Sequence, residues 1–402
     1  MVMVESPDTI FSRAATLHQA GHLDQAEPLY RAVLEQQPKH GDALHLLGVL
    51  HYQQRDPAAA VPLIEAALRI IPGNAQAHAG LGLALLRLNR LEEALAAFDR
   101  ALVLKPDFDQ ALSRRGAALQ GLGRHAEALV SLDRALVYSA HDPETLNDHA
   151  AALISLGRPA EALADCDRAL ALQPGISQVL NNRGVALCNL GRKQEAVAAF
   201  RAALVAAPDV AGFHANLGAT LQELDELEAA EGCLRRALAL QKSSAIFQSL
   251  AGILYQRRQF AEATTIYQQW LEHEPDNPVA RHMAAAGSAA APERAGDQYV
   301  ATVFDGFAET FDKTLIGLGY RVPELLTGHI QKEIGNDARA LRILDAGCGT
   351  GLAAPLLKPM ASNLVGVDLS PGMLNKVAAA AALRRTCGWR VVCIHGQSSE
   401  RL

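Results

Sequence analysis

The sequence has little of several features that mark particular classes of protein. Aromatic residues make up 5% of its 402 residues, and its 6 cysteines contain no CxxC pair. No apolar stretch reaches the roughly 20 residues of a membrane span. The first residues carry Glu5 and Asp8 without a basic segment, so they do not predict a signal peptide. We therefore expect a cytoplasmic protein with reduced thiols.

Clusters of one charge and clusters of metal ligands are also missing from the sequence. The net charge is −6, with acidic and basic residues interspersed, which argues against nucleic acid and membrane surfaces as partners. The 14 histidines are scattered, and none pairs with a cysteine or carboxylate at ligand spacing. We predict no metal site.

What the sequence does contain is a repeat of 34 residues. Each unit has a small residue in one column, an alanine twelve residues later and a leucine eight residues after that. The small column is Ala14, Gly48, Gly82, Gly116, Ala150, Gly184, Gly218 and Ala251. Because antiparallel helices approach closely only where the crossing side chain is small, each unit is predicted to be a helix pair.

Prolines mark the end of most of these units. They are Pro38, Pro72, Pro106, Pro174, Pro208 and Pro275, whereas Ala140 and Lys242 take this place in two units. Proline cannot continue a helical ladder of hydrogen bonds, so it predicts the end of each second helix. The two junctions without proline are predicted to turn less sharply.

These columns resemble the tetratricopeptide repeat, in about eight units over residues 7–275, with a cap helix up to residue 286. The resemblance implies an all-α superhelix whose first helices line a concave groove that binds a peptide or protein. The groove positions expected from the register are His45, Tyr52, Gln120, Asn147, Asn181, Asn182 and Asn216. Asn182 and Asn216 occupy a column in which O-GlcNAc transferase repeats hold a ligand backbone. A solvated role or a role within the array stays open.

Residues 287–296, GSAAAPERAG, break the period and are predicted to be a linker. After them, four aromatic residues at helical spacing predict one apolar helix face. These are Tyr299, Phe304, Phe307 and Phe311.

A different motif follows at ALRILDAGCGTG. A short apolar run containing Asp345 leads into three alternating glycines and a helix, and a second apolar run ends at Asp368. This order is typical of a nucleotide-binding βαβ half, in which the second acid accepts hydrogen bonds from a ribose. Asp345 would repel a phosphate and attract a cationic ligand.

These residues resemble motifs of class I S-adenosylmethionine-dependent methyltransferases. Residues 297–402 are therefore predicted to be the N-terminal, incomplete part of a Rossmann-like α/β domain, with S-adenosylmethionine as cofactor. The resemblance implies cofactor binding by Asp345, Gly347, Gly349, Gly351, Asp368, Leu369 and Met373. Ser370 before Pro371 is predicted mainly as a helix N-cap. No catalytic residue can be assigned.

The resemblance covers only part of such a domain, which has seven strands in the family. Two strands are clear before residue 386, and residues 388–402 are predicted to add a third and to bring Gln397 near an adenine. Either the chain is truncated or residues 384–402 are read out of frame. A short parallel sheet would expose an edge and an apolar face, so we expect this part to fold poorly alone.

Two functions follow from the sequence. The first is methyl transfer from S-adenosylmethionine to an acceptor, possibly a protein, that the repeats recruit. The alternative is a non-catalytic repeat scaffold that binds a peptide or protein and carries a remnant methyltransferase domain.

Overall fold

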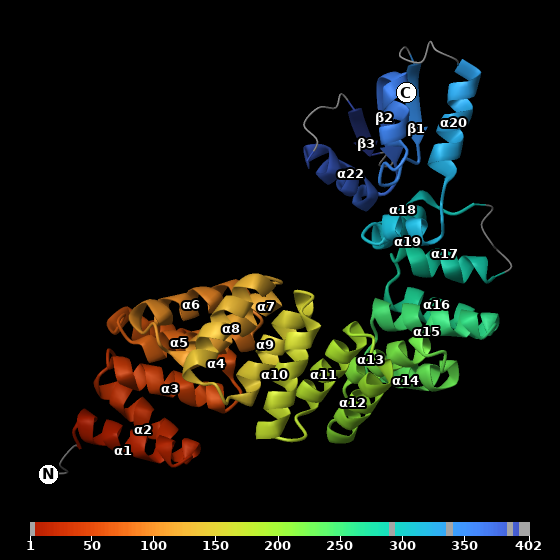
Figure 1. Cartoon of the computed structure of the whole chain (residues 1–402). Helices are drawn as coiled ribbons and strands as arrows, with labels where there is room; N and C mark the ends of the chain where they lie inside the picture. Colours follow the sequence, from red (N-terminus) through yellow and green to blue (C-terminus); the bar gives the residue numbers. More distant parts are fainter. Residues whose placement is uncertain (1–4, 289–293, 335–340, 384–388, 394–402) are drawn as a thin grey trace. The chain divides into compact units, whose positions relative to one another are not determined.

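The computed structural model describes residues 5–288, 294–334, 341–383 and 389–393 (Figure 1). The chain divides into two compact units, Met1–Gln241 and Lys242–Leu402. Two regions of the sequence analysis lie partly or wholly outside the described residues: the linker, through residues 289–293, and the segment around Gln397.

The first unit consists of helix pairs, coloured red to yellow-green in Figure 1. First helices have 13 residues and second helices have 14. They are α1 (Pro7–Gln19), α2 (Leu23–Gln36), α3 (Gly41–Gln53), α4 (Pro57–Ile70), α5 (Ala75–Arg87), α6 (Leu91–Leu104), α7 (Asp109–Gly121), α8 (His125–Tyr138), α9 (Pro143–Ser155), α10 (Pro159–Leu172), α11 (Ser177–Asn189), α12 (Lys193–Ala206), α13 (Ala211–Glu223) and α14 (Leu227–Leu240). The predicted helix pairs are confirmed.

The small column lies where the two helices of a pair cross. A Cβ atom added at Gly82 of α5 would stand 2.6 Å from the Phe98 ring of α6, and one at Gly184 of α11 would stand 2.5 Å from the Phe200 ring of α12. Both rings are buried. The glycines therefore leave the space that these aromatic side chains fill, as the sequence predicts.

The second helices end where the prolines predict. For example, α6 ends at Leu104, two residues before Pro106. Helices α8 and α14, whose units lack the proline, end at the equivalent residues Tyr138 and Leu240. The register of the repeat therefore sets the helix end in these two units without help from proline.

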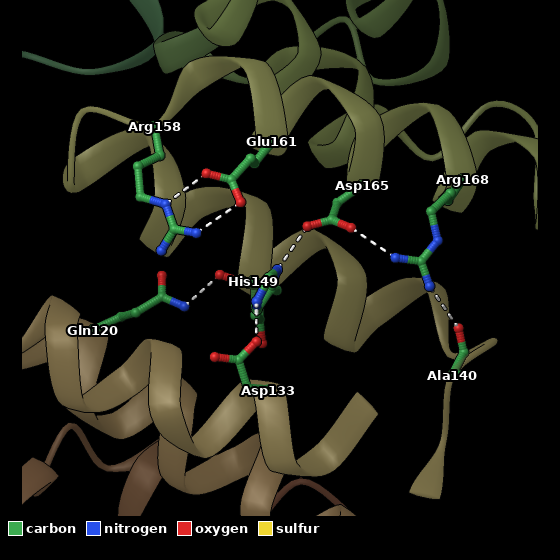
Figure 2. Close-up of polar contacts among 9 residues, drawn as sticks. Gln120, Asp133, Ala140, His149, Arg158, Glu161, Asp165 and Arg168 are labelled. Carbon is green, nitrogen blue, oxygen red and sulfur yellow. Dashed lines mark hydrogen bonds and ion pairs between the residues drawn. The ribbon is translucent and has the colours of Figure 1, made fainter. Parts of the chain in front are cut away.

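A largely buried histidine joins three helices of the first unit (Figure 2). The Nδ1 of His149 on α9 lies 2.6 Å from Asp165 Oδ2 on α10, and its Nε2 lies 3.0 Å from Asp133 Oδ1 on α8. Arg168 donates to the other Asp165 oxygen over 2.9 Å. Burial opposes a charge on His149, but hydrogen bonds to both carboxylates raise its pKa above the ordinary 6.5. The imidazole therefore links α8, α9 and α10 through its two ring nitrogens.

The second unit begins with α15 (Ser244–Gln256), α16 (Phe260–His273) and the short α17 (Pro278–Ala286). Next come α18 (Asp297–Phe307), α19 (Phe311–Gly317) and α20 (Val322–Ile334). The prediction of one apolar helix face over Tyr299, Phe304, Phe307 and Phe311 is wrong, because these residues lie in two separate helices. The helix breaks after Phe307, and Phe304 and Phe307 are 40% and 55% exposed.

The remaining elements of the second unit form a small α/β layer. They are β1 (Leu341–Ala346), α21 (Ala354–Leu357), the 3₁₀ helix η1 (Lys358–Met360), β2 (Ala361–Asp368), α22 (Pro371–Leu383) and β3 (Trp389–Cys393). The described strands are parallel in the order β1-β2-β3, with Asp345 beside Gly366 and Asp368 beside Cys393. The predicted third strand is thus present. Leu344 on β1 is 58% exposed.

The crossing at Gly82 can be tested by adding one methyl group. We predict that Gly82→Ala lowers the free energy of unfolding by about 1–2 kcal/mol, because the Phe98 ring must move in a packed core. Gly232→Ala on α14 is the matched control: no atom lies within 4 Å of its added Cβ, so higher helix propensity should stabilise it by about 0.5–1 kcal/mol. Urea unfolding followed by circular dichroism measures both. Equal gains in the two variants would contradict the close crossing.

The histidine cluster predicts a pH dependence of stability. The pKa of His149 is higher in the folded than in the unfolded chain, so its contribution is complete below about pH 6.5 and is lost as the pH rises through the folded value. His149→Gln should therefore cost more stability at about pH 5.5 than at about pH 8.5. The same replacement at the exposed His22 is the control. A cost for His149→Gln that is independent of pH would contradict the raised pKa of His149.

Candidate functional site

The predicted glycine turn lies between β1 and α21 and is fixed onto β2. The amides of Gly347 and Cys348 both donate to the carbonyl oxygen of Val367, over 2.8 and 3.0 Å. The backbone φ angles of Gly347, Gly349 and Gly351 are +77°, +53° and +81°. Residues other than glycine rarely adopt these positive φ angles. The turn therefore needs glycine for its backbone conformation as well as for the close approach of a ligand.

Asp368 at the end of β2 lies beside this turn. Its Oδ2 accepts the Gly349 amide over 2.8 Å, and its Oδ1 accepts the Ser370 amide over 2.9 Å. The carboxylate therefore joins the glycine turn to the loop that leads into α22. A carboxylate has about four acceptor positions, so two remain for hydroxyl donors such as those of a ribose.

Asp345 near the end of β1 has an unusual environment. Its Oδ2 is buried and accepts no hydrogen bond within the described residues. Burial, and then the negative charge of Asp368, raise the pKa of Asp345 above the ordinary 3.8. A buried acceptor without a partner is costly, and a ligand that brings a positive charge or a donor would relieve the cost.

Helices α18 and α19 supply contacts that the sequence did not reveal. Asp305 of α18 accepts the Ser370 hydroxyl and the Gly372 amide, the latter over 2.8 Å. The Thr350 hydroxyl in the glycine turn donates to Asp312 of α19. The two helices thus hold both loops of the candidate site. The sequence holds only a weak signal for these contacts, namely two acidic residues in the helical segment just before the glycine motif.

The other predicted residues differ in their exposure. Leu369 is half-buried, whereas Met373 is 1% exposed, so its side chain packs in the core. The Ser370 hydroxyl accepts the Met373 amide over 3.0 Å, which confirms the predicted N-cap. Burial raises the pKa of Cys348 to about 11, which keeps this thiol protonated.

Four of the predicted groove residues, all of them asparagines, pair with one another. Asn182 donates to the side-chain oxygen of Asn147, and Asn216 donates to that of Asn181, each over 2.9 Å. The amides therefore link successive first helices, which supports the role within the array that the sequence left open. Each pair uses one oxygen and one N–H, so each asparagine keeps some hydrogen-bonding capacity.

Two charged residues, Arg114 and Asp148, occupy the column of Asn182 and Asn216 in the two preceding repeats. Arg114 of α7 donates two hydrogen bonds of 2.6 Å to Glu144 of α9. Burial raises the pKa of Asp148 to about 6, with Arg114 opposing and Glu144 adding to the effect. The sequence did not predict this cluster of Arg114, Glu144 and Asp148. The place of Arg114 and Asp148 in the asparagine column was a signal for it.

Two further classes of site find no support. Across the described residues, no three or more His, Cys, Asp or Glu side chains are grouped so that they could hold a metal ion. Likewise, none of the helices in the described ranges is long and apolar enough to cross a membrane.

Comparison with known families assigns both parts of the chain. A model of the tetratricopeptide repeat matches residues 13–75 and 147–211, and two other models of this repeat match residues 51–115 and 215–244. A model described as a methyltransferase domain matches residues 343–400.

Individual relatives agree with this assignment. Human methyltransferase-like protein 27 is 37% identical over 83 residues, which are 20% of this chain and 34% of that protein, so the chain spans about a third of this relative's length. The crystal structure of the APC/C hetero-tetramer Cut9-Hcn1 matches with a TM-score of 0.53 and 20% identity, over 70% of this chain and 56% of that one. At this identity the likeness shows the fold alone.

A tetratricopeptide repeat protein from Parabacteroides merdae matches with a TM-score of 0.49 and 18% identity, over 62% of this chain and 98% of that one. The repeat models match the part of the chain in which the helix pairs are found, and the methyltransferase model matches the part that contains the glycine turn. The chain is therefore a tetratricopeptide-repeat protein that carries a methyltransferase domain.

Proposed function

We propose that the methyltransferase domain binds S-adenosylmethionine at the turn of residues 347–351, for methyl transfer to a protein that the repeats recruit. The observation that carries this proposal is the buried Asp345 Oδ2 without a partner, next to three glycines with positive φ. When bound, S-adenosylmethionine supplies a methyl group on a positively charged sulfur, which an acceptor nucleophile can attack in line.

The residues of the turn would divide the binding between them. Asp345 would pair with the positive charge of the ligand, which relieves its unpaired burial. The free acceptor positions of Asp368 would take the ribose hydroxyls, and Gly347 and Gly349 would allow the backbone to approach the ligand. Leu369 would contact the adenosyl part. The buried Met373 would support this loop from the core.

The repeats would raise the local concentration of the acceptor at the methyltransferase domain. Support comes from the row of half-buried polar side chains on the first helices, from Arg114 to Asn216. Amide side chains are complementary to the backbone of an extended peptide.

A second candidate function is a binding scaffold without catalysis. The observation in its favour is that the Met1–Gln241 unit is compact by itself, because each repeat packs on its neighbours. Binding of S-adenosylmethionine separates the two functions, since only the first requires it.

Asp345 predicts a pH dependence of S-adenosylmethionine binding. The carboxylate must be ionised to pair with a cation, and its pKa in the free protein is raised. Affinity should therefore fall as the pH is lowered from neutral through the raised pKa of Asp345. Asp345→Asn should weaken binding by about tenfold or more at about pH 7 and should remove most of the pH dependence. Calorimetric titration of the full chain measures both effects.

The matched control for this experiment is Asp297→Asn, which changes an exposed acid of the same unit and should bind as the unchanged chain does. Binding to Asp345→Asn with full affinity and the same pH dependence would rule out Asp345 as the partner of the cation. No binding to the unchanged chain would favour the scaffold.

A further inference from the structure

A pocket opens on the first helices of the second to fourth repeats, apart from the row of asparagines. It has a volume of about 410 Å³ and is formed mainly by α3 and α5, together with the start of α7. Its main lining side chains are His45, Leu46, Val49, Tyr52, Leu83 and Phe108. We call it the His45 pocket. Its walls are mainly apolar, so an occupant must be mainly apolar too.

The exposed Gln53, Gln76 and Gln110 also line this pocket, but His45 is its one nearly buried polar side chain. The side chain is 6% exposed, and within the described part of the chain its imidazole has no hydrogen-bond partner. Burial lowers the pKa of His45, with the nearby Asp42 opposing, so the ring is neutral at neutral pH. A neutral imidazole offers one donor and one acceptor. A nearly buried polar group without a partner is complementary to a ligand that supplies one.

The rim and the neighbouring repeats favour a peptide as the ligand. Tyr52, which lines the pocket, has the Arg87 guanidinium 4.8 Å from the centre of its ring. This cation–π contact fixes both side chains. Beyond it, the Arg114–Glu144 pair and the asparagine pairs continue along the first helices of the next repeats. An extended chain that fills the pocket with one side chain would pass these polar groups with its backbone.

We propose that the His45 pocket receives a tyrosine side chain of an extended peptide, whose hydroxyl bonds to the His45 imidazole. Its ring would lie among Leu46, Val49 and Phe108. An aliphatic or phenylalanine side chain would leave the imidazole buried and unpaired. The proposal rests on the proposed function in one respect, since it names a feature of the protein that the repeats recruit.

Gly80 of α5 allows the pocket to be closed without disturbing the fold. A Cβ atom at Gly80 would lie 3.8 Å from His45 Nε2 and 3.8 Å from Ile64 Cδ1, which are ordinary contact distances. Gly80→Leu therefore adds a side chain that fills the pocket. Gly232→Leu on α14 is the matched control, because it is the same change in a helix interior with no atom within 4 Å of its Cβ.

The experiment uses an array of random-sequence peptides probed with the fluorescently labelled full chain. We expect the bound peptides to be enriched in tyrosine. For the best binder, replacement of that tyrosine by phenylalanine should weaken binding by about tenfold, and replacement by alanine should weaken it further. Gly80→Leu should abolish binding, and Gly232→Leu should leave it unchanged. His45→Phe should bind the tyrosine and phenylalanine peptides equally.

Three results would overturn the proposal. If peptides bind without a preference for tyrosine, or bind Gly80→Leu as well as the unchanged chain, the pocket is not the recognition site, although recruitment by the repeats stands. If no peptide binds, the pocket proposal and peptide recruitment both fail. Titration with S-adenosylmethionine then decides separately whether the methyltransferase part of the proposed function survives.

Discussion

The close contact between the two helices of each repeat is the constraint on which the rest of the first unit depends. At Gly82 and Gly184, a missing side chain admits the ring of Phe98 or Phe200 from the partner helix. Each pair can bury its remaining apolar face only against its neighbours, so the pairs stack in register. This register brings residues 35 positions apart side by side, as Asn147 and Asn182 are. The row of polar side chains and the His45 pocket both follow from it.

The candidate cofactor site depends on a different constraint, the positive φ angles of the glycine turn. These angles let the amide of Gly349 reach Asp368, so the turn and the end of β2 form one rigid piece. Asp305 and Asp312 then attach α18 and α19 to the same loops. The helices before the sheet therefore take part in shaping the site, and Asp345 is left as the buried acceptor that a ligand can satisfy.

Local patterns in the sequence predicted most of the fold. The small column, the prolines and the strand-turn-strand motif depend on neighbours within about one repeat, so periodicity alone locates them. Contacts between distant residues leave no such pattern. Asp305 meets Ser370 across 65 residues, and Thr350 meets Asp312 across 38. Spacing correctly indicated helix around Phe304 and Phe307 but gave no information on what would cover these rings, and both are exposed.

The most direct test of the account is a calorimetric titration of the full chain with S-adenosylhomocysteine, which shares the ribose and adenine with the proposed methyl donor. The account predicts a dissociation constant on the order of micromolar for the unchanged chain and for Asp297→Asn. Asp368→Asn should bind about tenfold more weakly or worse, because a carboxylate that accepts from hydroxyls is lost. Undetectable binding to the unchanged chain, with its helices intact by circular dichroism, would contradict the central claim.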